Sequence, residues 1–343
     1  MKAIAIDGYG DTGVARVQDL PEPAPGRGEV VVAMRAAALN RLDLWTLSGT
    51  LGLDIPFPFV LGADGAGDVH SVGEDVDGVE PGMRVLVNPG LSCGRCERCR
   101  VGEQSECSSF RMLGEHTHGT FAEHVKVPAL NVFPIPDHLS YEEGAALGVT
   151  FITAYRMLFT KGRMRPGEWL LITGIGGGLA LSLLQLARPV AGRILVTSSS
   201  AEKLRRAVEL GADEVVDYAT EDVGKAVRRL TFKRGVDLVV DSAGGPQFDA
   251  LLRSLVQGGR VVVSGATAGR TAEIDLRRLF WKQLTVLGST MGSNADVAGM
   301  LRLVTGSKLR PIVDRVFPMA EARNALDYLG AQERFGKVVL SIR

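Results

Sequence analysis

The chain has 343 residues, and its 39 basic and 39 acidic side chains give a formal net charge of zero. This balance argues against nucleic acid or an anionic membrane as the main partner. At about 100–200 residues per domain, the length predicts two domains. No apolar run reaches the roughly 18–20 residues of a membrane span, and the N-terminal residues become polar too soon for a signal peptide. We therefore expect a cytoplasmic protein whose cysteines are reduced unless something holds them.

The first 140 residues predict short β-strands joined by turns. Two β-rich runs, Lys2–Ile6 and Glu29–Arg35, are separated by a loop of prolines and glycines at residues 21–28. Further short strands are expected at Gly67–Val72 and Arg84–Val87, next to glycine-rich turns.

The pattern changes near residue 145, where strands begin to alternate with helices. Alternation at this spacing is typical of βαβ units and of a parallel sheet. The strands are expected at 169–173, 193–197, 214–217, 236–241 and 259–264, and the helices at 179–188, 201–210, 222–230 and 246–256. An apolar strand follows at 284–288, then helices near 295–304 and 319–329 and a last strand at 337–342. The sequence thus predicts an α/β fold.

All four cysteines lie within a stretch of fifteen residues, with the spacing C-x2-C-x2-C-x7-C. Two residues between cysteines let a tight turn direct both thiolates at one tetrahedral zinc ion. The alternative is a pair of disulfides or free thiols, which a cytosolic chain without other cysteines disfavours. Four thiolates fill the coordination shell, so we predict one structural zinc ion per chain, held by Cys93, Cys96, Cys99 and Cys107.

A glycine cluster stands between the buried strand that ends at Thr173 and the helix that follows. A dinucleotide-binding fold brings its backbone against a pyrophosphate at this place. The letters do not form a strict G-x-G-x-x-G, because Leu179 stands where the third glycine would be, and ordinary turns can also be rich in glycine. Since βαβ units follow, the candidate phosphate loop consists of Gly174, Gly176, Gly177 and Gly178.

The end of the second strand of such a fold distinguishes NAD from NADP, because an acidic residue there binds the ribose 2′-hydroxyl. Here the strand ends without a carboxylate and runs into Ser198, Ser199 and Lys203, which suit a 2′-phosphate. An alternative role for Ser199 is to cap the following helix, with Glu202 completing a capping box. The sequence favours NADPH over NADH as the cofactor.

Taken together, these features resemble the medium-chain dehydrogenase/reductase family of zinc-type alcohol dehydrogenases and quinone oxidoreductases. The matching stretches, in order, are LGADGAG at 61–67, the cysteine lobe at 91–110, GTFAEH at 119–124, residues 170–180, VDLVVD at 236–241 and GKVVL at 336–340. The resemblance implies a GroES-like catalytic domain of residues 1–145 and 290–343 and a Rossmann cofactor domain of residues 146–289.

The same resemblance implies roles for further residues. Tyr218 corresponds to a position beside the 2′-phosphate of NADPH, as do Ser198 and Lys203. Ser242 lies in a segment that contacts the nicotinamide, and Lys337 falls where the family places a basic residue near the cofactor phosphates. The family also pairs its apolar edge strand across a two-fold axis, so a homodimer or homotetramer is expected.

The departures from the family pattern bear on function. Zinc alcohol dehydrogenases of the family bind a catalytic zinc through a cysteine in C-x-x-D, a histidine in G-H-E and a third ligand further on. Asn40 and Ala63 stand at the first two positions and Val149 near the third, while Asp43 and Asp64 remain as acidic neighbours. The pattern resembles the metal-independent branch of the family. It implies NADPH-dependent hydride transfer to a quinone, enone or related carbonyl compound.

In this interpretation Asn40 donates a hydrogen bond to the substrate carbonyl, and His116 is the candidate proton donor. His118 would face the same side if both histidines lay on one strand. A solvated loop, or a non-standard metal site of His116, His118 and Asp64, are the alternatives. Leu51 stands near the position of the proton-donating tyrosine of enoyl reductases, which disfavours an enoyl thioester.

Two other functions of the whole chain stay open on the sequence. One is an alcohol dehydrogenase or aldehyde reductase with a non-standard or absent catalytic metal. The other is a non-catalytic nucleotide-binding protein of the crystallin type, which would keep the fold and the cofactor without turnover.

Overall fold

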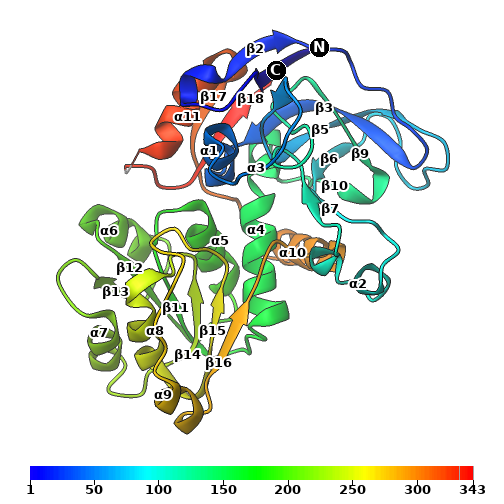
Figure 1. Cartoon of the computed structure of the whole chain (residues 1–343). Coiled ribbons are helices and arrows are strands. Elements are labelled where there is room, and N and C mark those ends of the chain that lie inside the picture. The colour runs from blue at the N-terminus through cyan, green and yellow to red at the C-terminus, as the bar shows by residue number, and fades with distance from the viewer. Residues whose placement is uncertain (332, 343) are drawn as a thin grey trace. The chain divides into compact units, whose positions relative to one another are not determined.

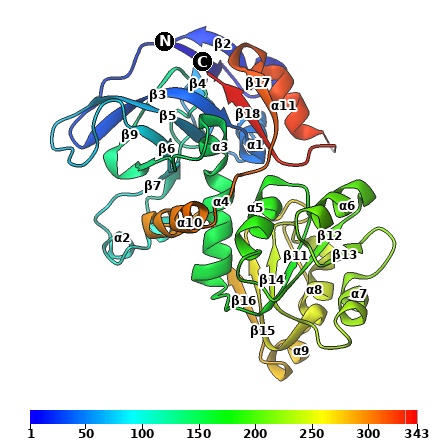
Figure 2. The same ribbon diagram turned by 180° about the vertical axis from the view of Figure 1, so that it is seen from behind.

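The computed structural model describes residues 1–331 and 333–342. The chain divides into two compact units, one made of Met1–Ile152 and Gly292–Arg343 and the other of Thr153–Met291 (Figure 1). Both ends of the chain therefore lie in the first unit (Figure 2). No helix in the described part of the chain has both the length and the apolar character needed to cross a membrane.

The first unit is built on a seven-stranded sheet with the order β10-β6-β5-β3-β18-β17, in which β9 also pairs with β3. All neighbours are antiparallel except β17 and β18. Its strands are β3 (Glu29–Ala38), β5 (Asp64–Val72), β6 (Arg84–Val87), β9 (His124–Pro128), β10 (Val132–Pro134), β17 (Val313–Pro318) and β18 (Lys337–Ser341). A three-stranded sheet joins β2 (Arg16–Asp19), β1 (Lys2–Ile6) and β4 (Phe59–Val60).

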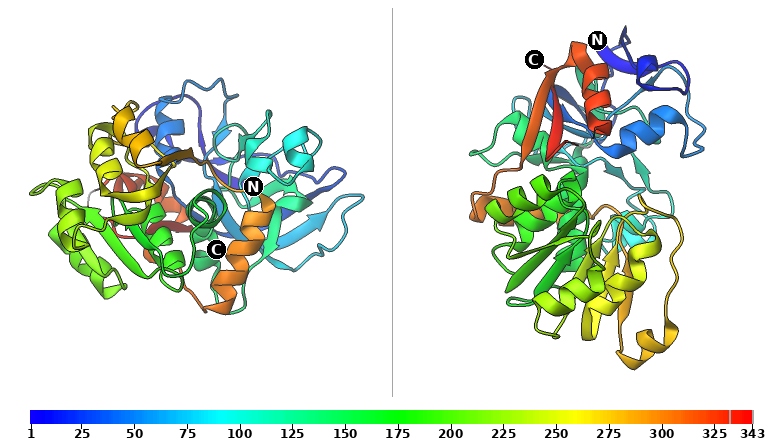
Figure 3. Two further views of the ribbon diagram at one scale, coloured as in Figure 1. Left: turned by 90° about the horizontal axis from the view of Figure 1, so that it is seen from below. Right: turned by 90° about the vertical axis from the view of Figure 1, so that its left-hand side faces the viewer.

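Short helices complete this unit. They are α1 (Arg41–Ser48), α2 (Glu97–Arg100), α3 (Tyr141–Ala146), α10 (Asn294–Gly306) and α11 (Ala322–Gly330), and α4 (Val149–Tyr155) also begins here. The C-terminal helix α11 contacts β17, β18 and α1 (Figure 3). Buried apolar side chains from β1, β3, β18 and α11 belong to one core, so the C-terminal tail is an integral part of the β-rich unit.

The second unit is a six-stranded sheet with the order β13-β12-β11-β14-β15-β16, and every pair in it is parallel. Its strands are β11 (Trp169–Ile172), β12 (Arg193–Ser198), β13 (Glu214–Asp217), β14 (Val236–Asp241), β15 (Leu255–Val263) and β16 (Thr285–Gly288). Its helices are α5 (Gly178–Ala187), α6 (Ala201–Glu209), α7 (Val223–Leu230), α8 (Phe248–Ser254) and α9 (Leu276–Trp281). The order reverses between β11 and β14, as in doubly wound nucleotide-binding folds.

The predicted α/β class is confirmed, because a β-rich unit accompanies a parallel sheet with alternating helices. Several predicted boundaries are wrong by two to four residues. The helix expected at 246–256 is α8, Phe248–Ser254, the strand expected from 259 begins at Leu255, and the helix expected near 319–329 begins at Ala322. Leu255 has the extended angles φ −78° and ψ 146° and begins β15. Tertiary pairing with β14 thus takes residues that local periodicity assigns to the helix.

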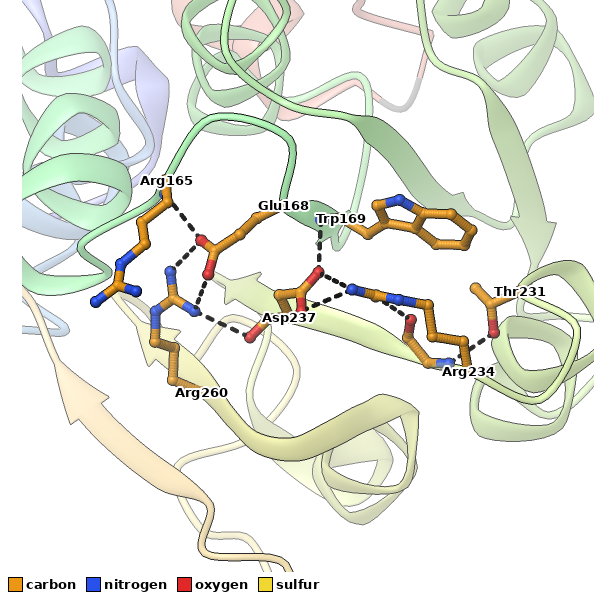
Figure 4. A network of polar contacts seen from close by, with 8 residues as sticks. Arg165, Glu168, Trp169, Thr231, Arg234, Asp237 and Arg260 are labelled. Atoms are coloured by element: carbon orange, nitrogen blue, oxygen red, sulfur yellow. Dashed lines mark hydrogen bonds and ion pairs between the residues drawn. The ribbon is translucent and has the colours of Figure 1, made fainter.

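An ion-pair network holds the amino-terminal edge of the parallel sheet together (Figure 4). Arg260 of β15 donates to both carboxylate oxygens of Glu168, at 3.0 and 2.5 Å. Asp237 of β14 accepts from the Trp169 amide at 2.8 Å and from Arg234 at 2.9 Å. These contacts join the starts of β11 and β14 to Arg260, which lies opposite Leu238 in β15, so this edge is occupied by structural side chains. The carboxyl-terminal edge of the sheet holds the glycine cluster.

Candidate functional site

Three polar side chains of the first unit form a buried cluster. Lys337 Nζ donates to Asn40 Oδ1 at 2.7 Å and to Asp64 Oδ2 at 2.9 Å. The Asn40 amide in turn donates to the same Asp64 oxygen at 2.9 Å. Asp64 has no exposed surface, Lys337 is 4% exposed and Asn40 is 6% exposed. A buried ion pair of this kind is stable only where its remaining polar atoms are also bonded.

Strand register brings these three residues together. Val339 of β18 lies opposite Ala38 of β3, so the same antiparallel register places Lys337 opposite Asn40. On the other side of β3, Ala38 lies opposite Asp64, the first residue of β5. The cluster therefore forms where the end of one strand meets the beginnings of its two neighbours.

The second carboxylate oxygen of Asp64 is bound by the start of α4. The Val149 amide donates to Asp64 Oδ1 at 2.6 Å. A Cβ atom on the preceding residue, Gly148, would lie only 2.1 Å from that oxygen. This approach of backbone to carboxylate requires glycine at position 148, because no side chain fits there.

Asp43 lies beside the cluster and is completely buried. Its Oδ2 accepts a hydrogen bond of 2.7 Å from the backbone N–H of Asn40, at the N-terminus of α1. Burial raises the pKa of Asp43 to about 7, against the lowering effect of the Asn40 N–H donor, and the negative charge of Asp64 adds to the rise. Asp43 is therefore a carboxyl group whose charge changes near neutral pH.

The two candidate histidines do not share a strand: His116 is the last residue of a turn at 114–116, and His118 follows an isolated bridge residue, Thr117. Gly114 donates to the Thr117 carbonyl at 2.8 Å, and β9 begins only at His124. The expectation that strand alternation directs His116 and His118 to one side is therefore wrong, because the two residues do not lie on a strand. His116 Nδ1 accepts from the Met112 amide at 3.2 Å, and His118 Nδ1 accepts from the Val60 amide at 3.3 Å.

The non-standard metal site considered for these histidines does not assemble in the described residues. The structure brings together two groups of at least three potential metal ligands there, and neither contains His116, His118 or Asp64. Burial also lowers the pKa of His118, which favours its neutral form.

The four cysteines form one of those two groups, with all sulfur atoms within 4.8 Å of one another. The Cys96–Cys99 and Cys93–Cys99 sulfur distances are 3.5 and 4.0 Å. Four sulfur atoms at about 2.3 Å from one zinc ion stand about 3.8 Å apart, so the geometry fits tetrahedral zinc. Backbone amides of Cys93 and Ser109 donate to Cys107 Sγ, each at 3.4 Å, which favours a thiolate. The predicted structural zinc site is thus supported by its donor set.

The glycine cluster of the second unit lies at the point where strand order reverses. Thr173 follows β11, and its hydroxyl donates to Asp241 Oδ1, at the end of β14, at 2.6 Å. Gly174 and Gly176 have positive φ angles of 67° and 108°, which L side chains rarely adopt. Gly178 begins α5. Backbone N–H groups at a helix start in this position suit a pyrophosphate.

The residues expected to distinguish the two cofactors meet at the ends of β12 and β13. Ser198 pairs with Asp217 across these strands, and the Tyr218 amide donates to the Ser198 carbonyl at 3.1 Å. A Cβ on Gly176 would lie 2.5 Å from Lys203 Cδ, so the Lys203 side chain passes over the glycine loop. The structure therefore brings Lys203 next to the glycine loop, and it brings Ser198 next to Tyr218.

The helix cap is one residue later than the alternative role for Ser199 supposes. Ser200 Oγ accepts from the Lys203 amide at 3.4 Å, and α6 begins at Ala201. Ser199 is exposed and is not the N-cap residue. The cap requires the hydroxyl immediately before the first helical residue, which leaves Ser199 available to a ligand.

Ser242 follows β14, and its carbonyl accepts from the Thr267 hydroxyl at 3.2 Å. A hollow beside it is lined by backbone of the loops after β14 and β15. The lining includes Gly244, Gly245, Gly265, Ala266 and Gly269. The predicted nicotinamide segment thus lies at the same sheet edge as the phosphate loop.

Sequence reasoning missed one feature of the first site. It named Asn40, Asp64 and Lys337, but gave Lys337 a place near the cofactor phosphates. In the structure the Lys337 ammonium binds Asn40 and Asp64. Its cofactor role stays a prediction. No local pattern links residues 40 and 337, because strand register alone makes them neighbours.

Comparison with known proteins agrees with this architecture. Residues 26–137 match the alcohol dehydrogenase GroES-like domain, and residues 178–306 match the zinc-binding dehydrogenase family. The chain is 31% identical to the acryloyl-coenzyme A reductase of Metallosphaera sedula, over 99% of this chain and 100% of that protein. It is 30% identical to an NAD-dependent alcohol dehydrogenase of Sulfurisphaera tokodaii, over 95% of this chain and 96% of the other.

A crystal structure of an NAD-dependent alcohol dehydrogenase superimposes with a TM-score of 0.95 and 44% identity, over 100% of both chains. The similarity to these relatives extends over 95–100% of this chain, in sequence and in structure. The chain belongs to the medium-chain dehydrogenase/reductase family of zinc-type alcohol dehydrogenases and is an NAD(P)-dependent oxidoreductase.

Proposed function

We propose that this protein is an NADPH-dependent reductase that transfers hydride to a quinone, an enone or a related conjugated carbonyl compound without a catalytic zinc ion. The observation that carries the proposal is the Lys337 ammonium, bonded to Asn40 and Asp64 at 2.7 and 2.9 Å. Asn40 and the neighbour of Asp64 correspond to two ligand positions of the zinc enzymes. The Lys337 ammonium thus bonds the side chain at one of these positions, Asn40, and the carboxylate next to the other, Asp64.

The donor set supports this assignment. Amide and carboxylate oxygens suit an ammonium, whereas catalytic zinc sites of this family use thiolate and imidazole ligands. An ammonium has three N–H donors, and Lys337 uses two of them within the cluster. We assign the third to a substrate oxygen, where the positive charge stabilises the oxyanion that develops as hydride arrives.

Asn40 takes a positioning role in this mechanism. Its two amide hydrogens are directed to Asp64 Oδ2 at 2.9 Å and to the Ala38 carbonyl at 3.4 Å. Its oxygen accepts from Lys337. The amide therefore orients the ammonium, and we transfer the polarising role first expected of Asn40 to Lys337. His116 stays the proposed proton donor, because its bonded Nδ1 leaves Nε2 for proton exchange.

The cofactor would be held by the second unit. Bound NADPH supplies the hydride. The four glycines of the loop would receive the pyrophosphate, Ser198, Ser199, Lys203 and Tyr218 the 2′-phosphate side, and Ser242 the nicotinamide. The absence of a carboxylate side chain at residues 198–200 and the course of Lys203 over Gly176 support NADPH.

Two substrate classes follow from the relatives. The name of the Metallosphaera sedula relative is that of an enzyme acting on a conjugated thioester, which supports an electron-poor double bond as acceptor. The names of the alcohol dehydrogenases support a second candidate, oxidation of alcohols or reduction of aldehydes. The two candidates differ in the compound that reacts with the cofactor, a conjugated compound in the first and an alcohol or aldehyde in the second.

The proposal is tested with zinc-loaded enzyme and a panel of quinones, enones, an enoyl thioester and aldehydes. We expect NADPH-dependent turnover of the conjugated compounds. K337M and the neutral pair D64N/K337M should each lower kcat by roughly 10²–10³-fold, the usual cost of losing one oxyanion donor. The Kd for NADPH should not change. Lys2, which is exposed on the same unit, offers K2M as a control with the same loss of charge.

Two results would contradict the proposal. If K337M raises the Kd for NADPH and leaves kcat intact, Lys337 serves the cofactor phosphates, as the family resemblance first suggests. If the protein oxidises alcohols or reduces aldehydes with a higher kcat/KM than it shows for the conjugated compounds, the alcohol dehydrogenase candidate is correct.

We also propose that the chain forms a homodimer or homotetramer through β16. This strand is the last in the sheet order, and Val286 in it is 39% exposed. The adjacent Phe280 and Trp281 are 67% and 74% exposed. An exposed apolar edge of this kind is usually covered. Light scattering at micromolar concentration should give at least twice the chain mass.

A further inference from the structure

We propose that Glu22, His70 and His124 form a surface zinc site on the first unit, in addition to the four-cysteine site. The ligand atoms of the three residues all lie within 4.8 Å of one another. None of them belongs to the sites described above, and the inference goes beyond the proposed reductase activity.

The strands of the large sheet bring the two imidazoles together. His124 of β9 lies opposite Ala33 of β3. His70 lies on β5, the other neighbour of β3, between Val69 and Ser71, which pair with consecutive residues of β3. His70 is thus the extra residue of a β-bulge, a feature that redirects a side chain. The rings of His70 and His124 lie 4.9 Å apart, centre to centre, on either side of the strand that carries the small Ala33.

The carboxylate of Glu22 comes from the loop between β2 and β3 and faces both rings. Its Oε1 lies 3.2 Å from His124 Nδ1 and 3.8 Å from His70 Nε2. Two ligands at about 2.1 Å from one ion stand about 3.0–3.4 Å apart in octahedral or tetrahedral geometry. The first distance lies in this range, and the second needs a shift of a few tenths of an ångström.

The surroundings of the cluster leave its ligand atoms accessible to a metal ion. His124 Nδ1 is buried and makes no hydrogen bond within the described residues. The cation that acts electrostatically on His124 is the N-terminal ammonium, which donates to the Leu20 carbonyl at 2.8 Å and not to Glu22. Two imidazoles and one carboxylate are a recognised zinc ligand set that leaves a fourth position for water. Zinc at this place would tie the loop at residues 21–28 to two strands of the sheet.

The rival explanation is an ordinary pair in which a proton, and not a metal ion, lies between His124 and Glu22. A measurement of bound zinc distinguishes the metal site from this ordinary pair. Untagged full-length protein is dialysed against micromolar Zn²⁺, and the metal in the protein is counted. The tag is omitted because a polyhistidine tail binds zinc itself, and the N-terminal Met1 and Leu20 are bonded close to this loop.

We expect two zinc ions per chain in the unchanged protein and one in H70A, H124A and E22Q. His138 bonds the Leu309 carbonyl, far along the chain from this cluster, so H138A serves as the control and should keep two. A single zinc in the unchanged protein, or two in H70A, would overturn the inference. Two zinc ions in H70A would mean that the second ion binds elsewhere, for example at a catalytic site. That result would contradict this inference, and a catalytic zinc would contradict the proposed function, so the two failures are distinguishable.

Thermal unfolding supplies a second measurement. Zn²⁺ should raise the Tm of the unchanged protein and of H138A, because a ligand that binds only the folded state stabilises it. It should not raise the Tm of H70A. The His70 side chain is 52% exposed, so its removal leaves the core intact, and the retained cysteine-bound zinc reports on folding. Equal shifts in H70A and H138A would count against the site.

Discussion

Lys337 donates a hydrogen bond of 2.7 Å to the amide oxygen of Asn40, a residue 297 positions earlier in the chain. The same ammonium lies 2.9 Å from the Asp64 carboxylate, and all three side chains are buried. Asn40 follows β3 and Asp64 begins β5, and within the described residues the hydrogen bonds of this ammonium to them use two of its three N–H donors. The third is the donor that we propose for a substrate oxygen.

The ion pair predicts a specific pattern of stability. K337M and D64N each leave one buried charge without its partner, which costs about 3–5 kcal/mol. The double variant D64N/K337M removes both charges and should lose much less than the sum of the two single changes. Denaturant unfolding, monitored on the β-rich unit, measures the difference. Additive losses would show that Lys337 and Asp64 do not interact.

Gly148 is predicted to be irreplaceable. G148A places a methyl group 2.1 Å from Asp64 Oδ1, so it must displace the carboxylate or the start of α4. We expect a loss of stability of roughly 1–3 kcal/mol, typical of overpacking, together with reduced turnover. Gly306 is the last residue of α10, and a Cβ atom added there would have no other atom within 4 Å. G306A is therefore the control, and it should leave the free energy of unfolding unchanged or raise it slightly.

The cysteine lobe should bind one zinc ion that is structural. C107S removes a sulfur atom that accepts from the Cys93 and Ser109 amides, so we expect loss of the lobe's zinc and a Tm lower by several degrees. S109A keeps the amide donor and should retain the metal. Release of zinc by a mercurial reagent, followed with a metal-sensitive dye, measures the content. Unchanged zinc in C107S would contradict the four-cysteine assignment.

Lys203 should determine the preference between cofactors. A charged hydrogen bond to a phosphate contributes about 1.5–3 kcal/mol, so K203A should raise KM for NADPH by roughly 10–100-fold. KM for NADH should change little, because NADH lacks the 2′-phosphate. Lys225 of α7 is exposed, and K225A serves as the control with equal loss of charge. A wild-type protein that prefers NADH in kcat/KM would show the NADPH proposal to be wrong.

Asp43 should give the protein a distinctive pH dependence. Burial raises its pKa from the model-compound value of 3.8 to about 7, so between these values the folded state binds more protons than the unfolded state. Stability therefore falls as pH rises through this window, and the unfavourable contribution is complete above pH 7. D43N keeps an oxygen acceptor for the Asn40 amide without the charge. Its Tm should fall less between pH 4 and 7 than that of the unchanged protein.

The features that depend on nearby residues could be predicted from the sequence. The strands at Glu214–Asp217 and Val236–Asp241 are found with the predicted bounds, because apolar runs between turn residues specify them locally. The cysteine spacing likewise predicts a group that the structure assembles, since short turns limit where the sulfur atoms can go. The resemblance to a known family then predicted the overall architecture, a GroES-like domain with a Rossmann domain.

Which distant polar groups meet depends on the packing of the whole chain and could not be predicted from the sequence. Lys337 reaches Asn40 and Asp64 because β18 pairs with β3 in one particular register, and a shift by one residue would direct its side chain to the other face. Glu22, His70 and His124 meet because a bulge redirects one imidazole and a loop carries the carboxylate over the sheet. His116 and His118 diverge because a turn replaces the expected strand. Register, bulges and long loops depend on the packed whole, so no local pattern encodes them.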